Sequence, residues 1–377
     1  MYLYTWVLYI SLSFLCVLLS RKMIDRKYAI GLKGNALNDT YIAAVFFFVL
    51  VFFAVFRTVL PDGTGGSDAY GYLQWFDNAP SIDEFFRYFK FNELLKDREP
   101  VFLLLNSIIK GISSSHRFYF LITYSIVVAG FIYFVYNLFR KDSYFFFLIL
   151  LIPCYIHSFN VMRSWISVSI CMFAFVQIIR RNWLKSIVLV AVAAMFHYMA
   201  MCFFFVIIAS LVEERMKHLI TGFRLIIVGV GMNFLTFVLK NSIQTFIMTT
   251  KYSYYENLFD GEVSLLGYTP PIMICLIGMM LYDHYKHNNI MSKCIVAVFV
   301  NFSLAYATIF LFAWRINDFF ALIRIVILSE FCVFLYKKGS VSIMNIFVYL
   351  FAIIVFFQQF FRMRASSHVF PYIIDLL

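Results

Sequence analysis

The stretch S-I-V-L-V-A-V-A-A-M-F-H-Y-M-A-M-C-F-F-F-V-I-I-A-S-L-V at residues 186–212 decides the fold class. It contains no Asp, Glu, Lys or Arg, and its one histidine, His197, lies near the middle. Crossing the hydrocarbon of a bilayer takes about 20 apolar residues in a helix. Because backbone groups in lipid must bond within their own segment, this run predicts membrane helices. We expect two short spans that break near His197, since a single long helix would move the charged segment 213–217 to the opposite side.

Comparable apolar runs recur along the whole chain. Apolar residues make up 63% of the sequence and charged residues 14%, whereas a soluble domain averages about 45–50% and about 25%. A soluble fold could not bury this much apolar surface, so we predict an all-α, polytopic membrane protein in which residues 1–377 form one transmembrane domain. About twelve spans are expected, at 1–20, 38–60, 118–139, 143–159, 161–180, a pair within 185–212, 219–240, 269–283, 293–313, 316–336 and 341–361.

The distribution of basic residues predicts the orientation of these spans. Short cytoplasmic loops collect Lys and Arg. The loops 21–39, 140–142, 180–185, 213–224, 283–293 and 337–338 hold 17 of the 31 basic and 6 of the 20 acidic residues. The opposite side holds 13 of each, so the net charge of +11 lies on one face, which we take as cytoplasmic. This charge therefore reports membrane topology and anionic lipid, and it does not indicate nucleic-acid binding.

Two segments are expected to lie outside the membrane on the non-cytoplasmic side, 61–117 and 241–268. The first opens with turn residues and continues into 82–89, where apolar residues recur with helical spacing opposite charged ones. That pattern predicts an amphipathic helix at the membrane surface. The apolar segment 99–112 is too short for an ordinary span, and we interpret it as a re-entrant or interfacial helix.

No motif of a soluble enzyme is present, and the seven cysteines are scattered without a Cys-x-x-Cys pair, so we expect no metal and no cofactor. What the sequence offers instead is a group of ionisable residues at the external ends of spans. Charges at membrane depth are costly and usually face a cavity or a partner. The group consists of Arg57, Asp68, Arg98, Glu99, Arg163, His197, Arg315 and the deeper Arg324.

Each member of this group also has a purely structural interpretation. Arg57 and Arg163 would reach lipid phosphates, Asp68 would serve a turn, and Glu99 would cap the helix that begins at Pro100. His197 would be a satisfied polar group between helices. In the same way, Arg315 would be an interfacial residue and Arg324 would pair with Glu330. Taken together, several arginines with carboxylates and a histidine on one side form a site for a polyanion, because guanidinium groups bind phosphate oxygens bidentately. The membrane-borne polyanion expected there is a lipid-linked pyrophosphate.

The order of short motifs resembles the EpsG family of Wzy-type polysaccharide polymerases. An arginine closes a span and is followed by a Gly-x-Asp-x-x-x-Tyr element, then by Glu-Pro-hydrophobic-Phe, then by Asn-x-x-Arg at the start of a span. An apolar run into His, a late Arg and a Pro-Tyr pair near the C-terminus complete the order. In this sequence the motif residues are Arg57, Gly66, Asp68, Tyr72, Glu99, Pro100, Phe102, Asn160, Arg163, His197, Arg315, Pro371 and Tyr372.

The resemblance implies a GT-C-like or Wzy-like glycosyltransferase of the bacterial cytoplasmic membrane, with its active site toward the periplasm or exterior. It would transfer a glycan from one undecaprenyl pyrophosphate carrier to a repeat unit on another. Asp68, Glu99 and His197 are the candidates for the base, with Asp68 slightly ahead. The residues assigned to pyrophosphate and glycan binding are Arg57, Arg98, Arg163, Arg315, Arg324, Tyr72, Asn160 and Tyr372.

Two other classes share parts of this pattern. A lipid-linked oligosaccharide flippase would use similar arginines, but it should show two related halves. An O-antigen ligase usually carries its large external loop late in the chain, whereas here the largest external stretch is 61–117. Membrane lipids and lipid-linked glycans are the expected partners, and a chain-length regulator and a flippase are the candidate protein partners.

Overall fold

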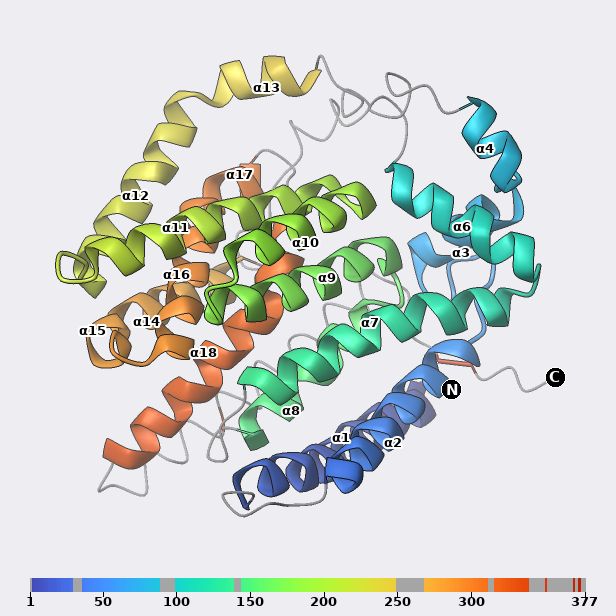
Figure 1. The fold of residues 1–377 in the computed structure, drawn as a ribbon, viewed down its shortest axis with the longest axis horizontal. Helices are drawn as coiled ribbons and strands as arrows, with labels where there is room; N and C mark the ends of the chain where they lie inside the picture. Colours follow the sequence, from blue (N-terminus) through green and yellow to red (C-terminus); the bar gives the residue numbers. More distant parts are fainter. Residues whose placement is uncertain are drawn as a thin grey trace. The chain divides into compact units, whose positions relative to one another are not determined.

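The computed structural model describes residues 2–29, 36–88, 99–138, 144–248, 268–310, 315–338, 350, 369 and 372–373. The regular elements in these residues are helices, so the predicted all-α class is confirmed (Figure 1). The helices group into two compact units. The first comprises 1–88, 101–173 and 332–377, and the second comprises 89–100 and 174–331.

The first unit contains the N-terminal helices and most of the segment 61–117, which the sequence predicts to lie outside the membrane. Its elements are α1 (Tyr2–Ala29), α2 (Ala36–Val55), α3 (Ser67–Asp77), α4 (Ile82–Tyr88), α6 (Pro100–Ile112), α7 (His116–Leu138), α8 (Tyr144–His157) and most of α9 (Met162–Ile179). In this unit α1 packs against α2 and α8, and α2 also packs against α7.

The second unit is built around α16, which packs against α11, α12 and α14. Its elements are α10 (Trp183–Phe196), the 3-10 helix η1 (Tyr198–Met201), α11 (Cys202–Met216), α12 (Gly222–Val238), α13 (Lys240–Met248), α14 (Thr269–Met280), α15 (Tyr282–Tyr285), α16 (Asn289–Ser303), α17 (Ala305–Phe310) and most of α18 (Ile316–Lys338).

The apolar helices indicate a membrane protein. Among the described residues, α7 and α9 are long and apolar enough to cross a bilayer by length and composition. Shorter apolar helices lie within the expected spans 1–20, 38–60, 219–240 and 269–283, and others overlap the first part of 185–212 and 293–313. Helices α8, α11 and α18 lie at 143–159, the second part of 185–212 and 316–336. The expected span 341–361 lies outside the described residues apart from residue 350. The existence of these helical segments is therefore confirmed. The number of twelve spans and their orientation remain predictions.

The break that the sequence predicts near His197 is confirmed. Helix α10 ends at Phe196, and His197 adopts an extended conformation with φ −156° and ψ 116°. After the single turn of η1 the chain starts α11 at Cys202, and α10 packs against α11 (Figure 1). The apolar run 186–212 is thus two helices.

Small residues allow helices of the first unit to approach closely. A methyl group added at Gly130 of α7 would lie 2.7 Å from the Cα of Ser169 on α9. The Ser169 hydroxyl donates a hydrogen bond of 3.0 Å to the backbone carbonyl of Val127. Because lipid gives helices no hydrophobic reason to associate, close packing of this kind and interhelical hydrogen bonds hold them together.

A buried ion pair links elements of the second unit. The ammonium of Lys293, on α16, lies 2.8 Å from the Glu213 carboxylate and 3.2 Å from that of Glu214. It also donates to the Ser210 carbonyl, and the Tyr282 hydroxyl donates to Glu213. Lys293 and Glu213 are both almost fully buried. Each charge therefore depends on the other, since an unpaired charge at this depth is strongly unfavourable.

The segment 61–117 contains one helix, α3, that the sequence analysis did not predict. We expected turn chemistry at 61–68 and placed the first external helix at 82–89. The second expectation is confirmed by α4, but α3 already begins at Ser67. The buried side chains of α3 are Ala69, Tyr72, Leu73 and Phe76. Their spacing of i, i+3, i+4 and i+7 is the ordinary signal of an amphipathic helix. The signal was overlooked because it directly follows the glycine-rich turn.

Candidate functional site

Asn160 joins the starts of two helices in the first unit. It lies in the short turn before α9, and its side-chain oxygen accepts a hydrogen bond of 2.7 Å from the backbone N–H of Asp68 and one of 3.1 Å from the Ser67 hydroxyl. Those groups belong to the first turn of α3, whose N–H groups have no partner within the helix. Gly66 has φ 128°, and a Cβ there would lie 2.9 Å from the Asn160 Cα. A glycine is therefore required for this contact.

Asp68 occupies the first turn of α3 and is partly exposed. A carboxylate at this position is stabilised by the positive end of the helix dipole. Its backbone is fixed by Asn160, so the position of the carboxylate depends on the turn that precedes α9. Asp68 is thus held in place and also accessible, as a base candidate must be.

Arg163 lies three residues after Asn160, in the first turn of α9, and is partly exposed. Its guanidinium carbon lies 5.3 Å from the ring centre of Trp75 and 6.0 Å from that of Phe102. Tyr72 packs edge-on against both rings, at 5.5 and 5.8 Å. The structure therefore places two residues of the predicted site, Tyr72 and Arg163, in one aromatic cluster, and Asp68 lies one turn before Tyr72 on α3. Trp75 completes that cluster and was not among the predicted site residues.

Arg57 lies in the interior of the first unit and is only 4% exposed. Its guanidinium carbon is 4.5 to 4.7 Å from the ring centres of Phe120, Tyr124 and Phe159, and Nη2 donates to the Phe159 carbonyl at 3.2 Å. Within the described residues, Nε and Nη1 have no hydrogen-bond partner. Cation–π contacts with three rings compensate part of the cost of burying this charge. Arg57 holds the residue directly before Asn160.

Tyr372 is packed into the first unit rather than presented at its surface. Its hydroxyl donates to the Phe53 carbonyl at 2.6 Å, and its backbone N–H donates to the Thr5 hydroxyl at 3.0 Å. The next residue, Ile373, accepts a hydrogen bond from the backbone of Thr58. Tyr372 and Ile373 therefore attach the described part of the C-terminal segment to the end of α2 and the residues just after it.

In the second unit the structure brings Glu99 and His197 together. The Nδ1 atom of His197 lies 3.3 Å from a carboxylate oxygen of Glu99, and both side chains are buried. Glu99 directly precedes α6, and His197 is the break between α10 and α11. A carboxylate that holds one nitrogen of an imidazole fixes the orientation of the ring. Among the described residues, this pair places a carboxylate and an imidazole together, as a general base requires.

Arg324 is held by two asparagines of the second unit. Its Nη1 donates to the side-chain oxygen of Asn301 at 2.5 Å, and its Nη2 donates to the backbone carbonyl of Asn317 at 3.0 Å. Glu330, its suggested partner, accepts a hydrogen bond from the Tyr285 hydroxyl at 3.4 Å. Arg315 precedes α18, partly exposed, with Nη1 3.9 Å from the Asp318 carboxylate. Arg98 lies outside the described residues.

Sequence reasoning missed Trp75, Asn301 and Asn317. The only signal for Trp75 was its place one turn after Tyr72 on the overlooked helix α3. Nothing in the local sequence marks the two asparagines, because Arg324 reaches them from other turns and helices. Within the described ranges, no group of three or more His, Cys, Asp and Glu side chains is placed to bind a metal ion.

Comparison with curated proteins and with solved structures gave no match. The sequence model of one protein family does match, over residues 40–374. The matched range includes the aromatic cluster around Arg163 and the Glu99–His197 pair. By this match over most of its length, the chain belongs to the EpsG family, which is implicated in exopolysaccharide biosynthesis.

Proposed function

We propose that the protein is a polysaccharide polymerase that joins oligosaccharide repeat units carried on undecaprenyl pyrophosphate. In the reaction, a hydroxyl oxygen of the acceptor repeat attacks the anomeric carbon of the donor glycan. The bond from that carbon to the pyrophosphate oxygen breaks, and the carrier leaves as undecaprenyl pyrophosphate. The hydroxyl proton passes to a base of the protein. The chemistry needs cations at the leaving group and a base at the acceptor.

The observation that carries this proposal is the placement of Arg163. A cation near the N-terminus of a helix is unfavourable, because the helix dipole is positive there. The same position attracts an anion, because the N-terminal end of a helix carries a partial positive charge. Arg163 also lies beside the partly exposed ring of Trp75. In this arrangement Arg163 would bind the phosphate groups and the ring of Trp75 would pack against the sugar. The pair therefore suits a glycosyl pyrophosphate.

One further cation and a base complete this proposal. Arg315 precedes α18 in the same way that Arg163 opens α9, and we assign it to the pyrophosphate as well. The base is either Asp68, in the first turn of α3, or the imidazole of the Glu99–His197 pair. The active site faces the periplasm or the exterior of a bacterial cytoplasmic membrane in the orientation that the basic loops predict.

The proposal is tested by expressing Arg163→Ala and Arg163→Lys in a strain that lacks the wild-type gene. We expect both proteins to insert normally. Arg163→Ala should abolish long-chain glycan and leave single repeats, and Arg163→Lys should retain part of the activity, because an ammonium keeps the charge but cannot bind bidentately. Electrophoresis of the extracted glycan reads the chain length.

Arg87 provides a matched control, because it is an exposed arginine of the external helix α4. Arg87→Ala should give a normal glycan ladder. Normal ladders from Arg163→Ala would remove that residue from the site. Accumulation of repeat units on the cytoplasmic side would instead favour a flippase. The base is identified by comparing three variants in the same assay: Asp68→Asn, Glu99→Gln and His197→Gln. The variant that lacks the base should lose turnover while still binding the lipid-linked substrate.

A further inference from the structure

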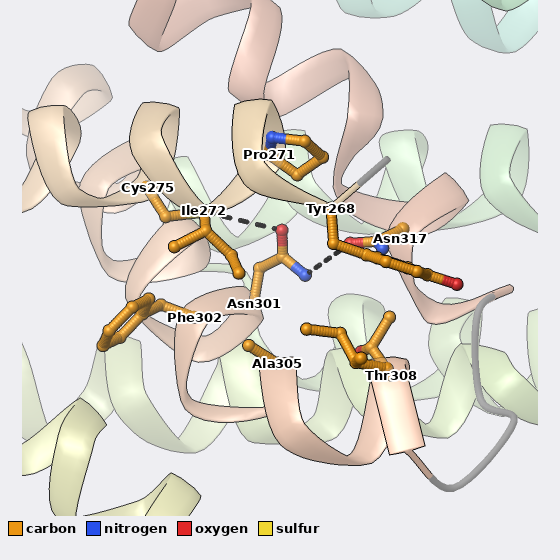
Figure 2. Close-up of a pocket in the computed structure, with 10 residues that line it drawn as sticks. Tyr268, Pro271, Ile272, Cys275, Asn301, Phe302, Ala305, Thr308 and Asn317 are labelled. Atoms are coloured by element: carbon orange, nitrogen blue, oxygen red, sulfur yellow. Dashed lines mark hydrogen bonds between the residues drawn. The ribbon is translucent and has the colours of Figure 1, made fainter. Parts of the chain in front are cut away.

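The two buried arginines of the predicted site are held by different kinds of acceptor. Arg324 donates to the side-chain oxygen of Asn301 and to the backbone carbonyl of Asn317. Figure 2 shows these two asparagines bonded to each other, beside a pocket with room for about one water molecule. Arg57 donates instead to the backbone carbonyl of Phe159, at 3.2 Å. Its bond therefore constrains the course of the main chain in the turn before α9.

The turn before α9 is held at three successive residues by groups from three other segments. The Tyr124 hydroxyl, on α7, donates to the Ser158 carbonyl at 2.9 Å. Arg57, just after α2, donates to the carbonyl of the next residue. The side-chain oxygen of Asn160 then accepts a hydrogen bond from the backbone N–H of Asp68, in the first turn of α3. The path of the chain between α8 and α9 is thus fixed at each step by a group from outside the turn.

Tyr124 and Arg57 also contact each other in the interior of the first unit. The guanidinium carbon of Arg57 lies 4.7 Å from the ring centre of Tyr124 and 4.5 Å from that of Phe159. The rings of Tyr124 and Phe159 pack edge-on at 5.7 Å. All three side chains are buried, as is Ser158. Because water cannot replace a bond lost at this depth, removal of either donor leaves a backbone carbonyl unsatisfied.

The start of α3 packs directly against the same turn. A Cβ atom at Gly66 would lie 2.9 Å from the Asn160 Cα and 2.9 Å from the Phe159 carbonyl oxygen. A displacement of the turn must therefore also displace the first residues of α3, where Asp68 lies. At its other end the turn runs into α9, whose first turn carries Arg163. The position of Asp68 relative to Arg163 thus depends on the turn.

We propose that Arg57 and Tyr124 are positioning residues of the polymerase: they hold the turn before α9 so that Asp68 keeps a fixed place relative to Arg163. This inference rests on the proposed function, and it takes Asp68 as the base. Arg57 then acts through the main chain, and not as the pyrophosphate ligand that its motif implies. Small misplacements of a reacting group lower turnover by up to about 100-fold. The two side chains therefore contribute to catalysis without touching the substrate.

The first arm of the test measures how firmly the start of α3 is held, by hydrogen–deuterium exchange of the full-length protein in lipid nanodiscs. Tyr124→Phe removes one hydroxyl, and Arg57→Lys keeps the charge but loses the planar group that packs against the rings. With about one hydrogen bond lost, the Asp68 amide should exchange about two- to tenfold faster in both variants. Tyr9→Phe is the matched control, because it removes a buried hydroxyl bond of 3.0 Å to the Val369 carbonyl rather than to the turn. It should leave exchange of the Asp68 amide unchanged.

The second arm measures turnover and KM, with the lipid-linked repeat unit extracted from the strain that lacks the gene. In Tyr124→Phe, turnover should fall about tenfold while KM stays within about twofold of the wild type. Tyr9→Phe should lose similar thermal stability and keep its turnover per folded protein. A merely structural role of Tyr124 would lower the yield of folded protein and leave its turnover unchanged. A rise in KM in Arg57→Lys would instead identify Arg57 as a ligand of the pyrophosphate.

The inference is overturned if Asp68 exchanges at the wild-type rate in both turn variants, or if the two phenylalanine variants lose turnover equally. It is also overturned if KM rises in Arg57→Lys while turnover is unchanged. Either turn variant decides the first arm where the other fails to insert. The exchange measurement needs no polymerisation. A wild-type protein without turnover would therefore refute the proposed function, whereas unchanged exchange at Asp68 refutes the positioning role itself.

Discussion

The motif assigns Asn160 to substrate binding, and the structure shows that its side-chain oxygen also holds the beginning of α3. It accepts hydrogen bonds from the Asp68 backbone at 2.7 Å and from the Ser67 hydroxyl at 3.1 Å, and so acts as a cap for α3. Asn160→Ala removes both bonds. Each is worth about 0.5–1.5 kcal/mol, and loss of a helix cap typically costs about 1 kcal/mol and at most about 2. We therefore expect α3 to lose about 1–2 kcal/mol of local stability.

The conservative variant separates the two roles of Asn160. Asn160→Asp keeps an oxygen in the capping position and adds a negative charge at the positive end of α3, where it is favourable. If Asn160 is a cap, Asn160→Asp should resemble the wild type. If instead its side chain contacts a pyrophosphate, the new carboxylate should repel the ligand, and Asn160→Asp should be the more damaging of the two variants.

Hydrogen–deuterium exchange in nanodiscs measures the local stability of α3. A loss of 1–2 kcal/mol raises the population of the open state about 5- to 30-fold, so amides of α3 should exchange faster by that factor in Asn160→Ala. In Asn160→Asp they should exchange at nearly the wild-type rate. Unchanged exchange in Asn160→Ala, or equal acceleration in both variants, would refute the capping argument.

Three further predictions follow from the packing and the charges. Gly130→Ala should cost about 1–3 kcal/mol in a thermal unfolding assay in detergent, because its methyl group would collide with α9; Gly71→Ala, which has open space around it, should be neutral or gain up to about 1 kcal/mol. Lys293→Met should cost about 3–5 kcal/mol in the same assay, because it removes the buried ammonium at 2.8 Å from the buried Glu213 carboxylate and leaves that carboxylate only the longer contact with Lys217 at 3.9 Å. Arg181→Met removes an exposed ion pair and should cost at most about 1 kcal/mol; similar losses for the two would contradict this reasoning. Hydrogen bonds from the Ser81 backbone N–H, and secondly from the Ser81 hydroxyl, lower the pKa of Glu84 below its ordinary value of 4.5. The cap that these bonds form at the start of α4 should therefore be intact above pH 4.5 and lost as the pH falls through the lowered pKa. An NMR titration that gives Glu84 an ordinary pKa would exclude the cap.

The sequence predicted the helical segments well because their cause is local. A run without charged residues must be helical in lipid wherever the rest of the chain lies, and the break at His197 could be placed because the charges at 213–217 required a return to the same side. Of the motif residues, Tyr72 and Arg163 lie in one aromatic cluster of the first unit, and their role in substrate binding remains a prediction.

The roles of individual residues were harder to predict, because a motif gives the identity of a side chain but not its direction. Arg57 and Tyr372 belong to the motif, yet both are buried and hold the backbone in place. Trp75 belongs to no motif, yet its ring stands beside Arg163. Burial and hydrogen-bond partners depend on which turns of distant segments meet, and this information is not contained in a short window of sequence.

By itself, the sequence determined that this chain is an α-helical membrane protein, where its apolar helices lie, and which ionisable residues stand at their ends. The reason is that transfer of apolar and charged groups between water and lipid depends on composition over a single span. Only the tertiary structure decided that Asn160 caps α3, that Glu99 meets His197, and that Arg324 meets Asn301. These contacts join residues between 23 and 98 positions apart, so they exist only once the helices have packed.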